Sequence, residues 1–194
     1  MTEKTMRKRD NQGFTLVEIM VVIAMIAILV AVATPQLNQA FDNFQFSNGM
    51  RMMLNSMNRA KGEAMNSGLF TTVLFTTDAN GRARYTAFVD DGAGGGTTRN
   101  GVRDGAERLI ITETMPRGVA LNTDGAATNF EKNAGGNYFT QFNTVGFPVG
   151  SDPEDGAKLI DYSGRITYNA TIGGQPVTQF IQLGIGGRMN ITKS

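Results

Sequence analysis

An apolar run of twenty residues near the N-terminus constrains this chain more than any other feature. Phe14 to Ala33 contains two polar residues, Thr15 and Glu18, and residues 19 to 33 contain none. Twenty helical residues are roughly 30 Å long, which matches the hydrocarbon core of a bilayer. Residues 1 to 13 are polar, with four basic residues against two acidic ones. Because basic flanks stay cytoplasmic, the rest of the chain is predicted to lie across the membrane.

Glu18 is the unusual residue of this run. A carboxylate facing lipid costs roughly 2.5 to 3.5 kcal/mol at mid-helix, and less near a helix end. Either its side chain simply reaches the membrane interface, or it meets a cationic partner in an assembly. Pro35 follows the run. Because proline has no amide hydrogen to donate, we expect a kink or local break of the helix there.

The residues around the start of the run carry a family resemblance. Gly13 to Glu18 read Gly-Phe-Thr-Leu-Val-Glu, between a basic leader and a helix of membrane length. This combination resembles the class III leader signature of type IV pilins and type II secretion pseudopilins. The resemblance implies that a prepilin peptidase cuts between Gly13 and Phe14, and that the new Phe14 amine is methylated.

The same resemblance implies how the processed chain is used. It aligns Glu18 with the glutamate thought to meet the N-terminal amine of a neighbouring subunit, and Pro35 with a helix-kinking proline common in the family. The implied partners are other pilin or pseudopilin subunits, the prepilin peptidase and an inner-membrane assembly platform. Independently, pairing the Phe14 ammonium with Glu18 of another subunit would offset two expensive buried charges.

A secretory signal peptide is an alternative interpretation of this segment. A basic region, an apolar region and a small-x-small end at Ala31-Val32-Ala33 follow one another. Cleavage there would release a soluble secreted protein beginning at Thr34. The acidic Glu18 and the helical pattern that continues beyond Ala33 argue against this interpretation.

Helical spacing of apolar residues resumes after Pro35 and continues to about residue 67, with Gly68 as a predicted C-terminal cap. Five methionines lie between residues 50 and 65. Flexible core packing is the favoured explanation, and a methionine-rich metal site is the alternative. The predicted parts are a leader (1–13), a membrane or filament-core helix (14–34), an amphipathic helix (35–68) and a globular β domain (69–194).

Short strands with turn residues between them follow Gly68, and Asn80-Gly81 is a strong hairpin signal. The predicted strands are 71–77, 84–89, 108–114, 119–122, 138–145, 159–162, 165–169, 177–185 and 188–191. We expect hairpins to join them. The predicted fold class is α+β and pilin-like, with the amphipathic half of the long helix packed on an antiparallel β-sheet or a two-sheet sandwich.

This layout is similar to the GspH/FimT group of pseudopilins and minor pilins. Residues 88–91, followed by a Gly-rich loop and residues 103–109, resemble the aspartate-glycine loop and next strand of that group. Gly187-Arg188 resembles its glycine-arginine ending. The lack of a C-terminal cysteine pair also suits this group better than a major pilin.

The amino-acid composition excludes most catalytic mechanisms. The chain has no Cys and no His, which excludes cysteine nucleophiles, thiolate zinc sites and histidine bases. There is no GxSxG sequence and no phosphate-binding glycine loop. We therefore predict no catalytic residue and no enzyme activity. The net charge of +1 gives no global basic field for nucleic acid.

The Gly-rich loop is a weak candidate for calcium. Calcium prefers several carboxylate or carbonyl oxygens, and Asp90, Asp91, Asn100 and Asp104 offer them. The spacing lacks the EF-hand pattern and its closing glutamate. A flexible surface loop without metal or other cofactor is the favoured interpretation.

DNA binding is the other weak candidate. Some relatives in the GspH/FimT group use a GRxR ending for DNA uptake, but this chain reads Gly-Arg-Met-Asn at 187–190. Arg188 would need help from Arg165 and Lys193, since phosphate contact requires a local cluster. A DNA-uptake pilin is therefore an alternative, and nucleic acid is not the expected partner.

The expected function is structural, as a minor pilin or pseudopilin of a type II secretion system or a type IV pilus. The expected location is the bacterial inner membrane, crossed once, with the N-terminus cytoplasmic and the globular domain periplasmic, followed by assembly into a filament. The sequence does not distinguish the two machines.

Overall fold

The computed structural model describes residues 14–150 and 163–193. The predicted leader, which includes Gly13, and the predicted strand at 159–162 lie outside the described residues. The chain divides into two units, residues 1–40 and 41–194. One helix, α1 (Leu16–Ser67), contributes to both.

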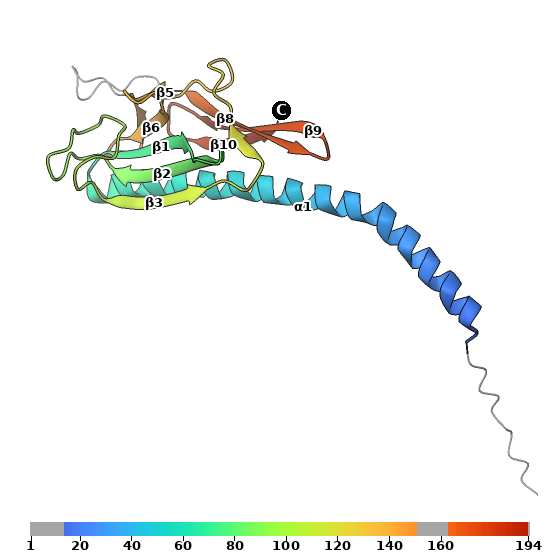
Figure 1. Cartoon of the computed structure of the whole chain (residues 1–194). Coiled ribbons are helices and arrows are strands. Elements are labelled where there is room, and N and C mark those ends of the chain that lie inside the picture. Colours follow the sequence, from blue (N-terminus) through green and yellow to red (C-terminus); the bar gives the residue numbers. More distant parts are fainter. Residues whose placement is uncertain (1–13, 151–162, 194) are drawn as a thin grey trace, which may run out of the picture. The chain divides into compact units, whose positions relative to one another are not determined.

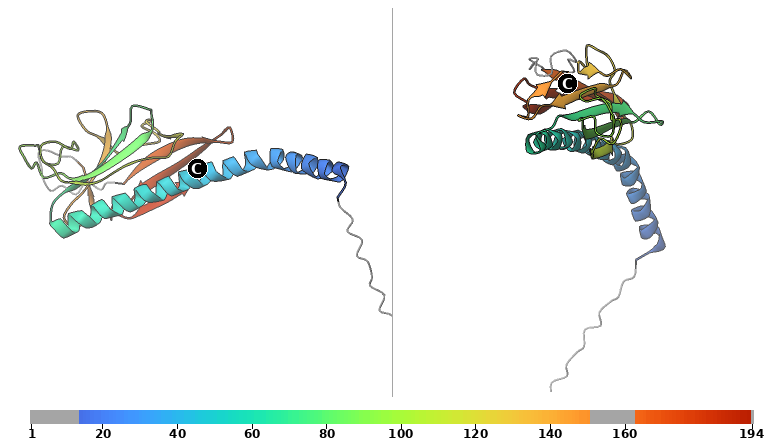
Figure 2. Two further views of the ribbon diagram at one scale, coloured as in Figure 1. Left: turned by 60° about the horizontal axis from the view of Figure 1, so that its bottom comes forward. Right: turned by 90° about the vertical axis from the view of Figure 1, so that its left-hand side faces the viewer.

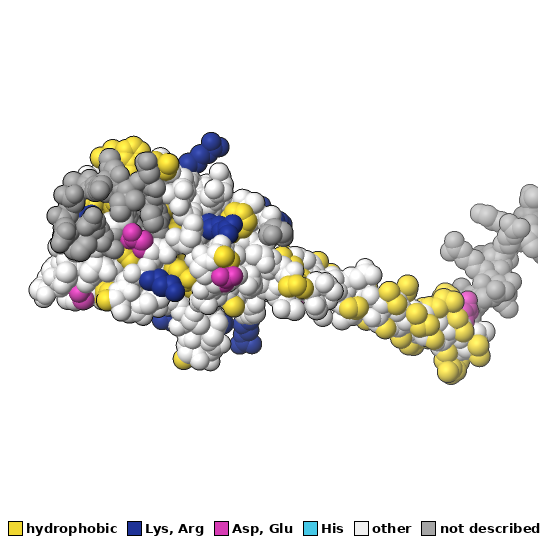
Figure 3. Space-filling view, turned by 90° about the horizontal axis from the view of Figure 1, so that it is seen from above, with side chains coloured by type: hydrophobic (Ala, Val, Ile, Leu, Met, Phe, Trp, Pro, Cys, Tyr) yellow, Lys and Arg dark blue, Asp and Glu magenta, His cyan; other side chains and the backbone are white. Residues whose placement is uncertain are grey.

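The first unit consists, in its described part, of the N-terminal stretch of α1. The Thr15 hydroxyl accepts a hydrogen bond from the Glu18 amide at 3.2 Å, which is the geometry of a helix N-cap. Large hydrophobic side chains cover this stretch and are exposed, as Figure 3 shows toward the N-terminal end of the helix. By length and composition, α1 is the one described helix that could cross a membrane.

Pro35 lies inside α1, and the helix continues through it. Of the two expected outcomes, the local break is wrong, and the kink stays a prediction. Proline removes only its own amide bond to the carbonyl four residues earlier. The hydroxyl of Thr34, which directly precedes the proline, donates to the Val30 carbonyl at 2.7 Å. The remaining bonds of the helix keep the segment helical.

The second unit contains two antiparallel sheets (Figure 1). The first has the order β3-β2-β1-β6-β5, with β7 beside β6, and the second has the order β10-β9-β8-β4. The strands are β1 (Thr71–Thr77), β2 (Ala83–Val89), β3 (Leu109–Thr114), β4 (Val119–Leu121), β5 (Glu131–Lys132), β6 (Tyr138–Phe142), β7 (Pro148–Val149), β8 (Gly164–Ile172), β9 (Gln175–Leu183) and β10 (Met189–Lys193).

The predicted turns are found where glycine permits a positive φ. β1 and β2 pair antiparallel across Asn80-Gly81, with Gly81 at φ 76°. β8 and β9 pair across Gly173-Gly174, and β9 pairs with β10. Gly68 follows the last turn of α1 with φ 68°, and its amide donates to the Ala64 carbonyl at 3.1 Å. The predicted cap of the helix is confirmed.

One predicted connection is wrong. The strands on either side of Pro116–Gly118 do not form a hairpin, because β3 pairs with β2 and β4 pairs with β8. Residues 116–118 instead carry the chain from the first sheet to the second. The predicted strand at 138–145 ends at Phe142, because residues 143–147 form a turn around the Asn143 side chain.

The core lies between the later half of α1 and the two sheets, as both views in Figure 2 show. The helix buries Met50, Met53 and Met57 completely, whereas Met52 and Met65 are exposed. The buried methionines pack in this core, as predicted. The α+β fold class, with a long helix on antiparallel sheets, is confirmed.

Candidate functional site

The predicted processing and assembly residues lie at the start of α1. Phe14 is 79% exposed and directly precedes the N-cap residue Thr15. Glu18 lies in the first turn, where a carboxylate is favoured by the positive end of the helix dipole. Within the described part of the chain, the Glu18 carboxylate has no hydrogen-bond donor or cation as a partner. It is therefore free to accept a cation from another molecule.

The Gly-rich loop is held by a buried carboxylate at its base. Asp90 is 1% exposed and accepts hydrogen bonds from the Thr72 hydroxyl at 2.8 Å and the Gln141 amide at 2.9 Å. The backbone amides of Arg99 and Gly101, from the far side of the loop, donate to the same carboxylate. Burial raises the pKa of Asp90, although these four donors act in the opposite direction.

Two further carboxylates close the loop. Glu107 is 1% exposed and accepts from the amides of Gly92 at 3.0 Å and Asp104 at 3.1 Å. Burial raises the pKa of Glu107 as well. Asp104 accepts from the Asn100 amide group at 2.9 Å and from the backbone of Thr97. Three acidic side chains thus organise one loop by binding its own N–H groups.

These contacts bear on the calcium candidate. Asp91 accepts from the Ala93 amide at 3.1 Å and takes no part in the Asp90 cluster. Over residues 14–150 and 163–193, no three Asp or Glu side chains are placed to share a metal ion. Calcium binding stays a prediction, and the observed role of these oxygens is to order the loop. Sequence reasoning did not identify Glu107, Thr72 or Gln141 as their partners.

The three cations proposed for DNA contact do not form one cluster. Arg165 is opposite Gln182 in the β8–β9 pair, at the end of the sheet where Arg188 precedes β10. Lys193 is opposite Gln179, four residues along β10 from Met189 and thus about 13 Å away. Arg165 is also engaged, since its guanidinium donates to the Ala126 carbonyl and lies over the Phe180 ring.

The glycine-arginine ending has a packing function. Gly187 has φ 71°, and a Cβ there would lie 2.6 Å from the Gly146 carbonyl oxygen and 2.9 Å from Lys61 Nζ. Lys61, on α1, donates to the Gly187 carbonyl at 3.0 Å. The β9–β10 turn is therefore fastened to the helix and to the turn at 143–147, and Arg188 is left exposed beside it.

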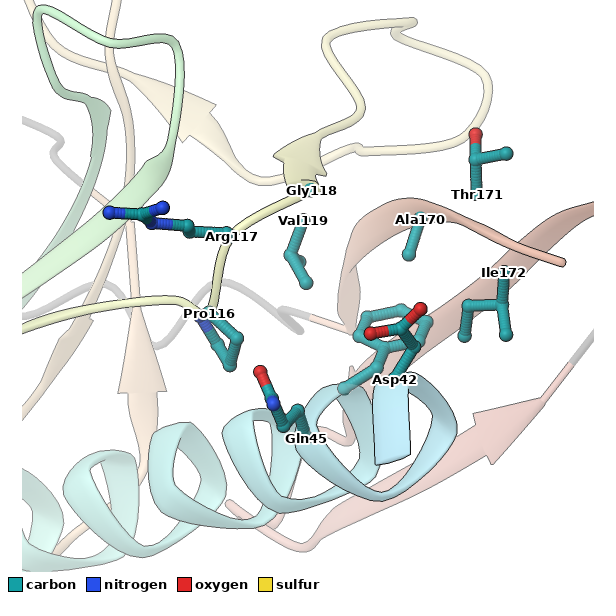
Figure 4. Close-up of a pocket in the computed structure, with 10 residues that line it drawn as sticks. Asp42, Gln45, Pro116, Arg117, Gly118, Val119, Ala170, Thr171 and Ile172 are labelled. Atoms are coloured by element: carbon teal, nitrogen blue, oxygen red, sulfur yellow. The ribbon is translucent and has the colours of Figure 1, made fainter. Parts of the chain in front are cut away.

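A groove of about 270 Å³ lies where α1, the 116–118 crossover and the end of β8 meet. Figure 4 shows Asp42 and Gln45 on α1, with Val119 and Ile172 on the strands, whereas the Arg117 side chain extends away. The groove is apolar along its floor and carries the Asp42 carboxylate at its edge.

Comparison with known families gives one match. The prokaryotic N-terminal methylation motif matches residues 8–34, which include the leader junction and the apolar stretch of α1. No curated protein and no solved structure matches the chain. A motif of this type indicates a structural subunit that assembles with other pilins after processing by prepilin peptidase. Together with the long helix packed on antiparallel sheets, it supports the identification of this chain as a type IV pilin-like protein.

Proposed function

We propose that this protein is a structural subunit of a helical filament, namely a minor pilin or pseudopilin of a type II secretion system or a type IV pilus. The observation that carries the proposal is the methylation motif over residues 8–34, placed on a helix whose apolar surface is exposed. Eighteen of residues 14–33 are apolar, and no other described part of the chain covers them. Such a helix is suited first to lipid and then to neighbouring helices.

Processing is proposed to occur between Gly13 and Phe14, followed by methylation of the Phe14 amine. Phe14 lies before the N-cap, so the new ammonium would sit one turn from the Glu18 carboxylate along the chain. The Glu18 carboxylate of one subunit is proposed to pair with the ammonium of another, because both charges would otherwise be buried without a partner. This contact would set the register between subunits.

The globular unit is proposed to lie in the periplasm and to form the outer surface of the filament. The sequence resemblance to the GspH/FimT group at residues 88–91, 103–109 and 187–188 supports a subunit that initiates or caps a filament. The hydrogen-bonded loop at 90–107 and the two-sheet core give it a rigid surface for contacts with other subunits or with cargo.

Intact mass and N-terminal peptide mapping of the membrane-fraction protein test this proposal. We expect a chain that begins at methylated Phe14. We expect Gly13→Ala to remain unprocessed, while the neighbouring substitution Gln12→Ala is processed normally. A chain that begins at Thr34 in the soluble fraction would instead establish a secreted domain and reject the filament subunit.

A further inference from the structure

Two aromatic side chains stand uncovered on α1 within the globular unit. Phe41 is 57% and Phe44 is 69% exposed, and the two residues lie one helical turn apart on one face. Arg51 is exposed two turns further along the same face. Within the described part of the chain, Arg51 forms no ion pair or hydrogen bond. We call Phe41, Phe44 and Arg51 the aromatic face.

The groove beside Asp42 has the complementary character. Its floor is made by nearly buried apolar side chains, Phe46, Val119 and Ile172. Its volume of about 270 Å³ exceeds the roughly 150 Å³ that accommodates a benzene ring. The Asp42 carboxylate at its edge has no cation or hydrogen-bond donor among the described residues. The groove thus offers an apolar floor and an unpaired negative charge.

Phe44 and Arg51 lie on a different side of the helix from Asp42 and Phe46, whereas Phe41 lies roughly 40° from Gln45, which lines the groove. At 100° per residue, Phe44 points roughly 160° away from both Asp42 and Phe46. Phe44 therefore does not fill the groove of its own chain. Asp42 and Arg51 are nine residues apart, which is roughly 13 Å along a helix and too far for an ion pair within one chain.

We propose that the aromatic face of one copy docks into the groove of a second copy, with the Phe44 ring on the apolar floor, Phe41 beside it and Arg51 toward Asp42. Charge complementarity and ring size favour this occupant. Because the two surfaces differ, the contact is head-to-tail, and such contacts generate helical assemblies when they do not close. The inference rests on the proposed filament function and supplies it with a specific contact between globular units.

The absence of native cysteine permits a direct test. Two full-length copies with different tags are expressed together, one with Asn48→Cys, exposed one helical turn from Phe44, and the other with Thr171→Cys, beside the groove. We expect a disulfide-linked mixed dimer after mild oxidation of the membranes. Thr112→Cys, exposed on β3, replaces Thr171→Cys as the control and should give at least several-fold less dimer. Equal yields from both pairs, or no mixed dimer, would overturn the proposal.

Charge reversal tests the polar half of the contact on the same cysteine pair. Arg51→Asp in the Asn48→Cys copy, or Asp42→Arg in the Thr171→Cys copy, should each reduce the dimer yield several-fold. Both changes together should restore it. Failure of the double change to restore the dimer would reject the Arg51–Asp42 contact.

N-terminal mapping of the same membranes separates the two proposals. Chains that begin at methylated Phe14 without the mixed dimer would reject the groove contact and leave the filament function standing. A specific mixed dimer formed by chains that still carry residues 1–13 would support the contact and reject the proposed processing.

Discussion

Asp90 is a buried carboxylate whose purpose is structural. Its oxygens bring together Thr72 of β1, Gln141 of β6 and two backbone amides of the loop, Arg99 and Gly101. A buried amide that loses its acceptor costs roughly 1 to 3 kcal/mol. These two loop amides therefore depend on this one side chain for their hydrogen bonds.

We expect Asp90→Ala to destabilise the full-length protein in detergent by roughly 1 to 3 kcal/mol at neutral pH, because four buried donors lose their acceptor. Asp91→Ala is the control, since Asp91 accepts one local amide. Thermal unfolding measures both. Equal melting temperatures for the two variants would contradict the structural role of Asp90.

The same variant should also change how the stability of the protein depends on pH. Burial raises the pKa of Asp90 above its ordinary value, so the folded protein binds this proton at higher pH than the unfolded chain does. Stability should therefore increase as pH falls through the folded pKa toward 3.8, the ordinary value. Glu107 contributes in the same direction. In Asp90→Ala, the increase should be smaller than in the unaltered protein.

Gly187 is a glycine whose replacement is opposed by both its backbone conformation and its packing. A side chain there would adopt φ 71° and would place Cβ 2.6 Å from a backbone oxygen, so both strain and collision act. We expect Gly187→Ala to cost about 1 to 3 kcal/mol. Gly186→Ala, in the same turn with nothing within 4 Å of its Cβ, should leave the melting temperature nearly unchanged. Equal losses would contradict the packing argument.

At the scale of elements, α1 is built for two surroundings. Its first half is apolar on every side, whereas its second half buries one face against the sheets. Met53 is fully buried and its neighbour Met52 is 43% exposed. We expect Met53→Ala to cost about 2 to 5 kcal/mol through lost burial and a cavity, and Met52→Ala less than about 0.5 kcal/mol. Denaturant unfolding in detergent distinguishes them, and similar losses would refute the assigned helix face.

The elements show which parts of the fold the sequence could reveal. β1 and β2 lie on either side of Asn80-Gly81. Their residue pattern and the chemistry of this turn therefore predict the two strands together. The crossover at 116–118 was missed because a proline-glycine turn looks the same whether the next strand pairs nearby or with distant β8. β5 and β7 have two residues each, too few for a pattern.

The candidate sites divide in the same way. Glu18 and the Gly13–Phe14 junction could be predicted from the sequence, because the residues of the motif are contiguous. Glu107 was missed as a loop-closing residue, since its partners Gly92 and Asp104 are defined only by the path of the folded loop. The groove could not be predicted from the sequence, because its three segments are brought together only by the fold.

At the scale of the whole molecule, the chain combines an anchor that lipid can hold with a globular unit that folds around its own core. The one costly feature of the anchor is the Glu18 carboxylate, which has no partner among the described residues. In a simple anchor, such a group makes insertion into the bilayer harder. A second molecule that supplies a cation would offset this cost.

We therefore expect Glu18→Val to leave membrane insertion intact and to reduce incorporation into sheared filaments at least tenfold. Glu18→Asp, which keeps the charge on a shorter side chain, should retain more incorporation than Glu18→Val, since the ammonium can still be paired at some loss of geometry. Fractionation measures insertion, and immunoblots of the filaments measure assembly. If Glu18→Val is incorporated normally, the carboxylate serves only to cap the helix or reach the interface, and register must be set by contacts between the globular units.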